Sequence, residues 1–244
     1  MSKALIVGGA NGIGLSIAHT LATDGKYTEI YIVDRAAVSA ENNHPKFKSI
    51  LFDLEDCNYD VFNQFADIDT LIITAGFGRL NLFENIEEQH IISSFNVNTV
   101  APIRIIRHFY ERLLHDADFK CAVMVSIAGY MSSPFFSIYA ATKAALRIFI
   151  ESVNVELEKS GSANRILNVS PGSIKGTSFN AGKTDLTLTS ALAKEIVEHL
   201  NDKDDLFIPQ YDEIFKEVLE RYHADFREEG RHSYDYKIKS GRIK

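Results

Sequence analysis

The chain has few cysteines and no long apolar run. Cys57 and Cys121 are its two cysteines in 244 residues, too few for the disulfide framework that is typical of small secreted proteins. No run of about 18 apolar residues occurs, and only a short apolar run precedes the first glycines, so neither a membrane span nor a signal peptide is expected. These absences favour a cytoplasmic protein without a membrane partner.

The sequence also lacks an excess of basic charge. It has 26 Lys and Arg against 33 Asp and Glu, a formal net charge of −7, whereas nucleic-acid-binding surfaces are basic. No group of His, Cys, Asp and Glu shows metal-ligand spacing, and there is no internal repeat or low-complexity segment. We therefore expect neither a nucleic-acid partner nor a bound metal.

What the sequence does contain is a regular alternation of short apolar segments and helical patterns. This alternation predicts an α/β fold with a Rossmann-type, doubly wound parallel sheet of about seven strands, whose ligands bind beyond the carboxyl ends of the strands. A chain of this length can form one domain, residues 1–244. The predicted strands are Ala4–Val7, Glu29–Val33, Phe47–Phe52, Thr70–Ile73, Cys121–Val125, Arg165–Val169 and Leu206–Pro209. The predicted helices are Gly12–Thr23, Phe95–His115, Ile138–Lys159, Ser190–Leu200 and Tyr211–Phe226.

A glycine-rich turn follows the first predicted strand. Gly8, Gly12 and Gly14, with Asn11 and Ile13 among them, lie where a helix begins. Glycines let such a turn tighten and let its backbone approach a pyrophosphate, which the free N–H groups of the helix then bind. The spacing Gly-x-x-x-Gly-x-Gly differs from the commoner Gly-x-Gly-x-x-Gly, and a tight turn without a ligand is the alternative interpretation.

Polar and small residues follow the other strands. Asp34 lies twenty residues after Gly14, where an acidic residue would meet the ribose hydroxyls of a dinucleotide, and Arg35 comes directly after it. Each such residue can also belong to an ordinary turn, so their convergence at the strand ends counts for more than any one of them. The further cofactor-binding candidates at strand ends are Asp53, Leu54, Thr74, Ala75, Gly76, Pro171 and Gly172.

Tyr139 and Lys143 lie four residues apart in a predicted helix, so they share one face of it. An ammonium there is expected to lower the pKa of the tyrosine from about 10 towards neutrality, which would let it exchange a proton with an alcohol or carbonyl. Ser126, at the end of the fifth strand, can hydrogen-bond the same substrate oxygen. Asn98 is either a buried polar anchor or part of a water relay. A Tyr-x-x-x-Lys match alone would be weak evidence; Ser126, the glycine-rich turn and the strand–helix alternation strengthen it.

Two segments near the C-terminus carry less information. Residues 173–200 include a polar stretch, Ser173–Thr189, and are expected to form a substrate loop or lid. Residues 227–244 hold six Lys or Arg against three Asp or Glu, and a solvated tail is the default expectation. The alternation of Tyr234, Tyr236 and Ile238 leaves open that this tail docks on something.

Taken together, these residues resemble the short-chain dehydrogenase/reductase family, in the branch whose chains have about this length. The similarity runs from Lys3 to about Thr177. The turn Val7–Gly14 resembles the family's Thr-Gly-x-x-x-Gly-x-Gly loop, with Val7 where threonine is usual. Thr74-Ala75-Gly76 stands where the family has Asn-Ala-Gly, and Pro171-Gly172 matches its Pro-Gly turn. The family's glycine-rich C-terminal ending is absent.

The resemblance implies a role for each matching residue. Asn98, Ser126, Tyr139 and Lys143 match the family's catalytic Asn, Ser, Tyr and Lys. Tyr139 would be the general acid and base, Lys143 would lower its pKa and bind the nicotinamide ribose, and Asn98 would hold a water linked to Lys143.

Two further residues match the family near the nicotinamide. The backbone of Ile174 would meet its carboxamide. The threonine that usually follows is displaced, because Gly176 stands at its position and Thr177 comes next.

The implied reaction is hydride transfer between C4 of a nicotinamide and a carbinol carbon of an alcohol or ketone. NAD is predicted over NADP, because the carboxylate of Asp34 would repel a 2′-phosphate and Asn11 is uncharged where some members carry a basic residue. Two other functions stay open: a nucleotide-binding sensor or scaffold without turnover, and a sugar-nucleotide epimerase or dehydratase, which shares Tyr-x-x-x-Lys.

Substrate and assembly are less determined by the sequence. Four apolar residues, Phe135, Phe136, Phe179 and Leu186, favour an apolar alcohol or ketone. The predicted helices Phe95–His115 and Ile138–Lys159 are apolar over more than one face, so we expect a homodimer through them, or a homotetramer.

Overall fold

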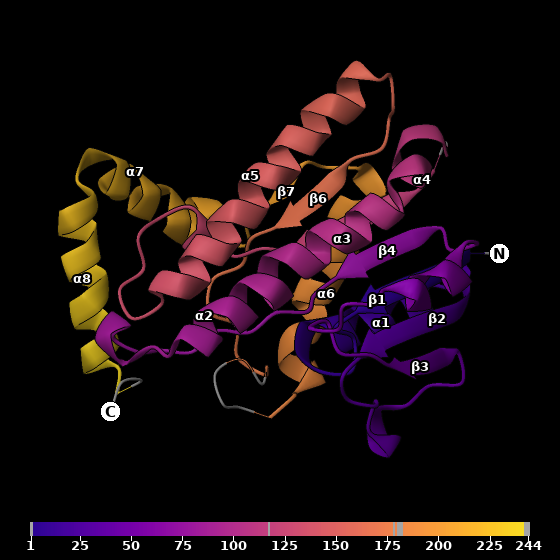
Figure 1. Cartoon of the computed structure of the whole chain (residues 1–244), viewed down its shortest axis with the longest axis horizontal. Coiled ribbons are helices and arrows are strands. Elements are labelled where there is room, and N and C mark those ends of the chain that lie inside the picture. Colours follow the sequence, from indigo (N-terminus) through magenta and orange to yellow (C-terminus); the bar gives the residue numbers. More distant parts are fainter. Residues whose placement is uncertain (1, 117, 178, 180–182, 242–244) are drawn as a thin grey trace.

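The computed structural model describes residues 2–116, 118–177, 179 and 183–241. Seven parallel strands form one sheet in the order β3-β2-β1-β4-β5-β6-β7 (Figure 1). The order reverses between β1 and β4, which is where doubly wound sheets bind their ligands. The predicted fold class is therefore confirmed. The strands are β1 (Ser2–Val7), β2 (Tyr27–Asp34), β3 (Phe47–Leu51), β4 (Thr70–Ile73), β5 (Lys120–Met124), β6 (Ile166–Val169) and β7 (Leu206–Phe207).

The central strands are buried on both faces. Every residue of β4 and β6 is buried, as are Ala4–Val7 of β1. Strands of a parallel sheet covered by helices on both sides need apolar residues at consecutive positions rather than at alternate ones. This explains why the short continuous apolar runs of the sequence marked the strands within one or two residues.

Helices cover the two faces of the sheet with separate cores. On one face lie α1 (Gly12–Thr23) and α6 (Leu186–Asp202), with buried leucines such as Leu21 and Leu200. On the other lie α3 (Ala101–His108), α4 (Tyr110–His115) and α5 (Ser137–Lys159). Helix α6 begins at Leu186, four residues earlier than predicted, because the side chain of Asp185 accepts the Thr187 N–H as a cap. Short 3-10 turns occupy Ala40–Asn42, Asp60–Phe65, Phe83–Asn85 and Ile127–Gly129.

The helix predicted over Phe95–His115 is interrupted. The chain forms α2 (Glu88–Phe95), then a π-helical turn over Asn96–Val100, and only then α3. A second break falls at Phe109, between α3 and α4. Pro102 lies in the first turn of α3, where proline is tolerated. The π turn carries Asn98, and such turns are frequent at functional sites.

The C-terminal region is helical, and most side chains of residues 227–241 in the predicted tail are exposed. A π-helical turn over Tyr211–Phe215 leads into α7 (Lys216–Ala224), and α8 (Phe226–Lys239) follows after Asp225, whose side chain caps it. Figure 1 shows both helices at the side of the molecule where α5 begins. The residues that α8 buries are Glu229 and Lys237, so its packing leaves no apolar periodicity in the sequence. Residues 242–244 of the predicted tail lie outside the described residues.

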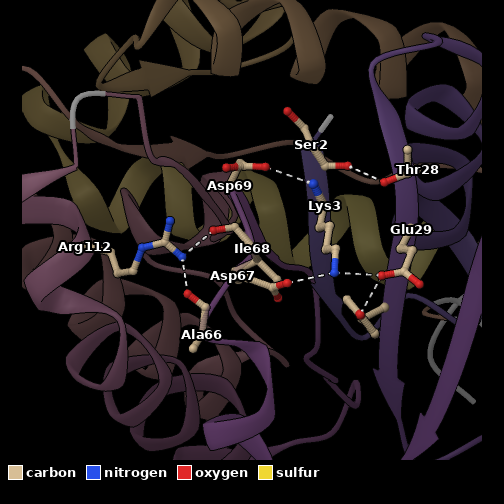
Figure 2. Close-up of polar contacts among 10 residues, drawn as sticks. Ser2, Lys3, Thr28, Glu29, Ala66, Asp67, Ile68, Asp69 and Arg112 are labelled. Atoms are coloured by element: carbon tan, nitrogen blue, oxygen red, sulfur yellow. Dashed lines mark hydrogen bonds and ion pairs between the residues drawn. The ribbon is translucent and has the colours of Figure 1, made fainter.

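The amino ends of the strands are held by a charged network (Figure 2). Lys3 on β1 places its Nζ atom 2.7 Å from Asp67 and 3.0 Å from Glu29 on β2. Its main-chain N–H donates to Asp69, just before β4. These contacts raise the pKa of Lys3 and lower the pKa of Asp67 and of Glu29. The network joins the neighbouring strands β2, β1 and β4 at their amino ends, opposite the ends that carry the predicted site residues.

Candidate active site

A cavity of about 840 Å³ lies at the carboxyl ends of the strands, within the size range of small-molecule and cofactor sites. All of the predicted site residues border it except Asn98 and Lys143, which are 0% and 2% exposed. The predicted residues at the cavity wall are Gly8, Asn11, Gly12, Ile13, Gly14, Asp34, Arg35, Asp53, Leu54, Thr74, Ala75, Gly76, Ser126, Tyr139, Pro171, Gly172, Ile174 and Thr177.

The glycine turn packs directly on the turn after β4. Gly8 has a φ of 86°, and a Cβ atom there would lie 2.4 Å from the Ala75 nitrogen. A Cβ atom on Gly14 would lie 2.4 Å from the Oγ1 atom of Thr74, which itself donates to the Gly8 oxygen at 2.9 Å. No side chain fits between the two turns, so this part of the cavity floor is main chain.

The N-terminus of α1 faces the cavity. Asn11 is its cap residue by position but makes no side-chain cap hydrogen bond. The N–H of Gly12 donates to the Oγ1 atom of Thr184 at 3.1 Å. Free N–H groups and a positive dipole end make such a terminus suitable for a phosphate group. Thr184 escaped the sequence analysis, because a threonine in a polar loop carries no pattern that links it to a glycine 172 residues away.

Asp34 is fixed at the end of β2 by main-chain groups. Its Oδ2 atom accepts the Ala10 N–H at 3.0 Å, and its Oδ1 atom accepts the Ala36 N–H at 3.1 Å. Arg35 is exposed beside it. Asp53 also borders the cavity, and its Oδ1 atom accepts the Glu55 N–H at 3.0 Å. The carboxylate of Asp34 is thus held in one orientation at the rim where an adenosine ribose is expected.

Tyr139 lies in the first turn of α5 within an aromatic cluster. Its ring centroid is 5.4 Å from that of Phe136 and 5.1 Å from that of Phe179. Burial raises the pKa of Tyr139 to about 12, and a hydrogen bond with Ser126 acts in the opposite direction. The phenol is therefore protonated at neutral pH and lies next to the serine hydroxyl, as a proton donor to a substrate oxygen would.

Lys143 lies one helical turn further and is almost completely buried. Its Nζ atom donates to the Met124 oxygen at 2.8 Å and lies 5.8 Å from the centroid of the Tyr139 ring. Burial lowers the pKa of Lys143 to about 7. At pH 7 this side chain is therefore protonated in about half of the molecules. The expectation of a tyrosine pKa lowered towards neutrality is wrong for this structure, because desolvation of the buried phenol has the largest effect and raises the pKa.

Asn98 holds the π turn against the loop after β4. Its Oδ1 atom accepts the Phe77 N–H at 2.9 Å, and its Nδ2 atom donates to the Phe77 oxygen at 2.8 Å and to Thr142 at 3.1 Å. A Cβ atom on Gly76 would lie 3.2 Å from both Asn98 and the Lys143 amine. Of the two sequence interpretations, these contacts match the buried polar anchor. A water relay stays a prediction.

The turn after β6 completes the wall. The Oγ atom of Ser126 donates to the Pro171 oxygen at 3.4 Å, and it accepts the Ala128 N–H at 3.2 Å. Gly176 has a φ of 78°, and a Cβ atom there would lie 2.8 Å from the Asp185 oxygen, which explains why glycine stands where the family has threonine. Thr177 lies next to Gly12 and is 9% exposed.

Several cavity residues were not predicted from the sequence. The segment after Gly76 contributes Gly78, whose missing side chain leaves room for Tyr139 and Phe179, and the exposed Arg79. Lys237 of α8 reaches the cavity from the C-terminal region. Phe136 and Phe179 border it as predicted for an apolar substrate, whereas Phe135 and Leu186 do not. Of the predicted lid Ser173–Thr189, residues 178 and 180–182 lie outside the described residues.

Within residues 2–116, 118–177, 179 and 183–241, no three His, Cys, Asp or Glu side chains are grouped to hold a metal ion. Over the same part of the chain, no helix has the length and apolar character needed to cross a bilayer.

A family model described as short chain dehydrogenase matches residues 2–187. The chain therefore belongs to the short-chain dehydrogenase family. Among curated proteins it is 29% identical over 185 residues to the "Uncharacterized oxidoreductase TDA5" of Saccharomyces cerevisiae, covering 72% of this chain and 56% of that protein. It is also 29% identical to the galactitol 2-dehydrogenase of Agrobacterium fabrum, covering 71% and 70%. The chain thus spans little more than half the length of the yeast relative.

Solved structures of the family share this fold. A short-chain dehydrogenase from Streptomyces avermitilis superposes with a TM-score of 0.76 at 20% identity, covering 97% of this chain and 100% of that one. A short-chain dehydrogenase from Sphingobium yanoikuyae in complex with NADPH superposes with a TM-score of 0.73 at 21% identity, covering 92% and 96%.

Proposed function

We propose that this protein is an oxidoreductase that transfers a hydride between a nicotinamide dinucleotide and an alcohol or ketone. The observation that carries the proposal is that Tyr139 and Ser126 both border a cavity whose floor is the glycine turn. A proton donor for a substrate oxygen and a main-chain cradle for a phosphate thus border one space.

The residues present fit such a cofactor. The contact of Gly8 with Ala75 leaves main chain rather than side chains beneath the cavity, and the α1 N-terminus can bind a pyrophosphate. Asp34 is oriented by the Ala10 and Ala36 amides to accept hydrogen bonds from ribose hydroxyls. Ile174 and Thr177 border the cavity beyond the Pro171-Gly172 turn, on the side proposed for the nicotinamide. When bound, the cofactor supplies or accepts the hydride.

The side chains of the site move the proton and orient the substrate. Ser126 orients the carbonyl oxygen, and Tyr139 donates its phenolic proton to that oxygen as it gains charge. A pKa of about 12 keeps the Tyr139 phenol protonated at neutral pH, which favours its role as an acid in ketone reduction. Lys143, with a pKa near 7, can take up or release a proton in the same region, as a group poised for acid–base work does. In alcohol oxidation the deprotonated form of Tyr139, the phenolate, would accept the alcohol proton, and a charged Lys143 would favour that form.

The choice between NAD and NADP depends on Asp34. A 2′-phosphate placed against this carboxylate would bring two like charges together, which costs several kcal/mol. The Sphingobium neighbour is described with NADPH, and one from Thermococcus sibiricus with 5-hydroxy-NADP. The exposed Arg35, directly after Asp34, could pair with the 2′-phosphate of NADP. We propose NAD as the preferred cofactor, on the orientation of Asp34.

For the substrate we propose a small alcohol or ketone with an apolar portion, because Phe136 and Phe179 surround Tyr139. Ser173, Thr177 and Phe179 border the cavity, which supports a substrate-loop role for this segment. We also propose a homodimer through α3 and α5, because Val100, beside α3, and Ile148 of α5 are exposed. A cytoplasmic location stays a prediction from the low cysteine content.

The test is nicotinamide absorbance at 340 nm, with NAD and NADP in both directions, over a panel of aliphatic alcohols and ketones, polyols including galactitol, and hydroxysteroids. Tyr139→Phe is expected to keep cofactor binding and lose about 10²–10⁴-fold in turnover or more. Tyr222→Phe, on α7 and not at the cavity wall, serves as the matched control. Near-native turnover of Tyr139→Phe on the best substrate would refute the mechanism, and binding without turnover of any substrate would favour a sensor.

A further inference from the structure

Helix α8 reaches the candidate active site through one side chain. Lys237 is 8% exposed and borders the cavity, and among the described residues that follow Phe179 it alone does so. In sequence it lies far from Tyr139, but α8 returns to the segment that immediately precedes α5. The family resemblance ends well before this helix, so nothing in the matched motifs assigns Lys237 a role.

Lys237 binds the loop that connects β5 to α5. Its Nζ atom donates to the Oγ atom of Ser133 at 2.8 Å and to the oxygen of Pro134 at 2.7 Å. The same atom lies 5.6 Å from the centroid of the Phe136 ring. A single cation thus contacts three residues of a four-residue stretch, and hydrogen bonds from a charged donor are stronger than those between neutral groups.

The loop needs such support, because one of its residues has an unfavourable backbone. Phe135 has a φ of 65°, a left-handed conformation that is rare for a bulky side chain and persists only where the surroundings impose it. Phe135 is 4% exposed, and its ring centroid lies 4.5 Å from that of Tyr234, which is also on α8. Its carbonyl oxygen accepts the Asn81 N–H at 2.9 Å. Helix α8 therefore contacts the strained Phe135 through Tyr234 and the residues beside it through Lys237.

The position of this loop determines the first turn of α5. The Phe136 oxygen accepts the Ala140 N–H at 2.8 Å, and the Phe136 N–H donates to the Ser133 oxygen at 2.9 Å. The Phe136 ring also packs on Tyr139. A shift of residues 133–136 would therefore move both the apolar wall of the cavity and the tyrosine beside it.

We propose that Lys237 is a positioning residue, which fixes the loop 133–136 from α8 and thereby sets the places of Phe136 and Tyr139 in the site. The catalytic consequence of this positioning rests on the proposed function, whereas the structural coupling between α8 and the loop does not.

Hydrogen exchange of the full-length protein, measured by mass spectrometry without substrate or cofactor, tests the coupling. Lys237→Met keeps most of the side-chain length and removes the donors, and Lys239→Met changes an exposed lysine of the same helix as a control. In Lys237→Met we expect at least about tenfold faster exchange of the Phe136 and Asn81 amides, equivalent to about 1.4 kcal/mol. Lys237→Arg is expected to restore part of the protection, and Lys239→Met to leave it unchanged.

Unchanged exchange of the Phe136 amide in Lys237→Met, with α8 still protected, would overturn the proposal. If Lys237→Met also deprotects α8, then Ser133→Ala decides, because it removes an acceptor on the loop and leaves the helix sequence intact. Faster loop exchange in Ser133→Ala supports the proposal, and exchange equal to wild type overturns it.

A kinetic measurement tests the consequence for catalysis. On any alcohol or ketone found to turn over, Lys237→Met is expected to raise KM or lower kcat at least about tenfold while the Kd for the nicotinamide cofactor stays the same, with partial rescue by Lys237→Arg. If Lys237→Met speeds exchange in the loop but no alcohol or ketone is turned over, then the structural role of Lys237 stands and the proposed function is refuted. A coupling without any change in the kinetics of an active enzyme would overturn the positioning role.

Discussion

The Nζ atom of Lys143 lies 5.8 Å from the centroid of the Tyr139 ring. Burial shifts the pKa values of the two groups in opposite directions, to about 7 for the lysine and about 12 for the tyrosine. Each shift favours the neutral form, because a buried site destabilises either charge. At neutral pH Tyr139 is therefore protonated and uncharged, and the protonation of Lys143 changes with pH in this range.

This shift predicts how stability depends on pH. Between pH 7 and 10.5, the ordinary value for lysine, unfolded Lys143 is protonated and the folded one is mostly not. The free energy of unfolding is therefore expected to rise with pH in this window, by up to about 1.4 kcal/mol per unit. Urea unfolding of the wild type and of Lys143→Met at pH 7, 8 and 9 measures the difference. Lys159→Met, exposed at the end of the same helix, should keep the wild-type slope; the same slope in Lys143→Met would contradict the assignment.

A second prediction concerns cofactor choice. If Asp34 reads the ribose, the wild type should prefer NAD by at least about tenfold in kcat/KM, which needs about 1.4 kcal/mol. Asp34→Ala should narrow this ratio or reverse it, because Arg35 would then be free to pair with a 2′-phosphate. Asp34→Asn removes the charge but keeps the shape of the side chain and one of its two acceptor atoms, so comparison with Asp34→Ala separates the effect of charge from support of the turn. If the wild type prefers NADP, then Arg35 rather than Asp34 determines which adenosine ribose is bound.

Asn98 gives a prediction about stability. Asn98→Ala removes hydrogen bonds to Phe77 and Thr142 and leaves buried polar groups unpaired. We expect it to lower the free energy of unfolding by about 2–4 kcal/mol, measured by urea unfolding. Asn63→Ala, at an exposed position, should change it by less than about 0.5 kcal/mol. A stable Asn98→Ala protein with reduced turnover would instead favour the water relay.

The dimer has a direct test. Ile148 and Val155 are 51% and 57% exposed and lie seven residues apart on α5, hence on one face. Light scattering at micromolar concentration is expected to give a dimer mass for the wild type and a monomer mass for the double variant Ile148→Glu, Val155→Glu. Leu51→Glu, at an exposed leucine on β3, should remain a dimer. A monomer mass for the wild type would refute the assembly.

The sequence predicted the sheet and most of the cavity wall because both depend on local patterns. Strands such as β4 are continuous apolar runs, and the glycine turn, Asp34 and Ser126 follow such runs directly. The π turn around Asn98 escaped prediction, because its apolar residues keep a helical spacing. Helix α8 escaped prediction because the residues that it buries are Glu229 and Lys237, and buried polar residues leave no periodic apolar signal. The tyrosine pKa was predicted in the wrong direction, since desolvation depends on neighbours such as Phe179 that only the folded chain brings close.

The contact between Gly8 and Ala75 also limits which residues can replace Gly8 during evolution. At position 8 both the backbone conformation and the 2.4 Å approach to the Ala75 nitrogen exclude a side chain. Gly25 and Gly161 have similar φ values, 76° and 84°, but an added Cβ atom would meet nothing within 4 Å. In an alignment of homologues we therefore expect position 8 to be invariant. Positions 25 and 161 should drift between glycine and asparagine, the residue that best tolerates the left-handed region, as neutral sites of a surface turn do.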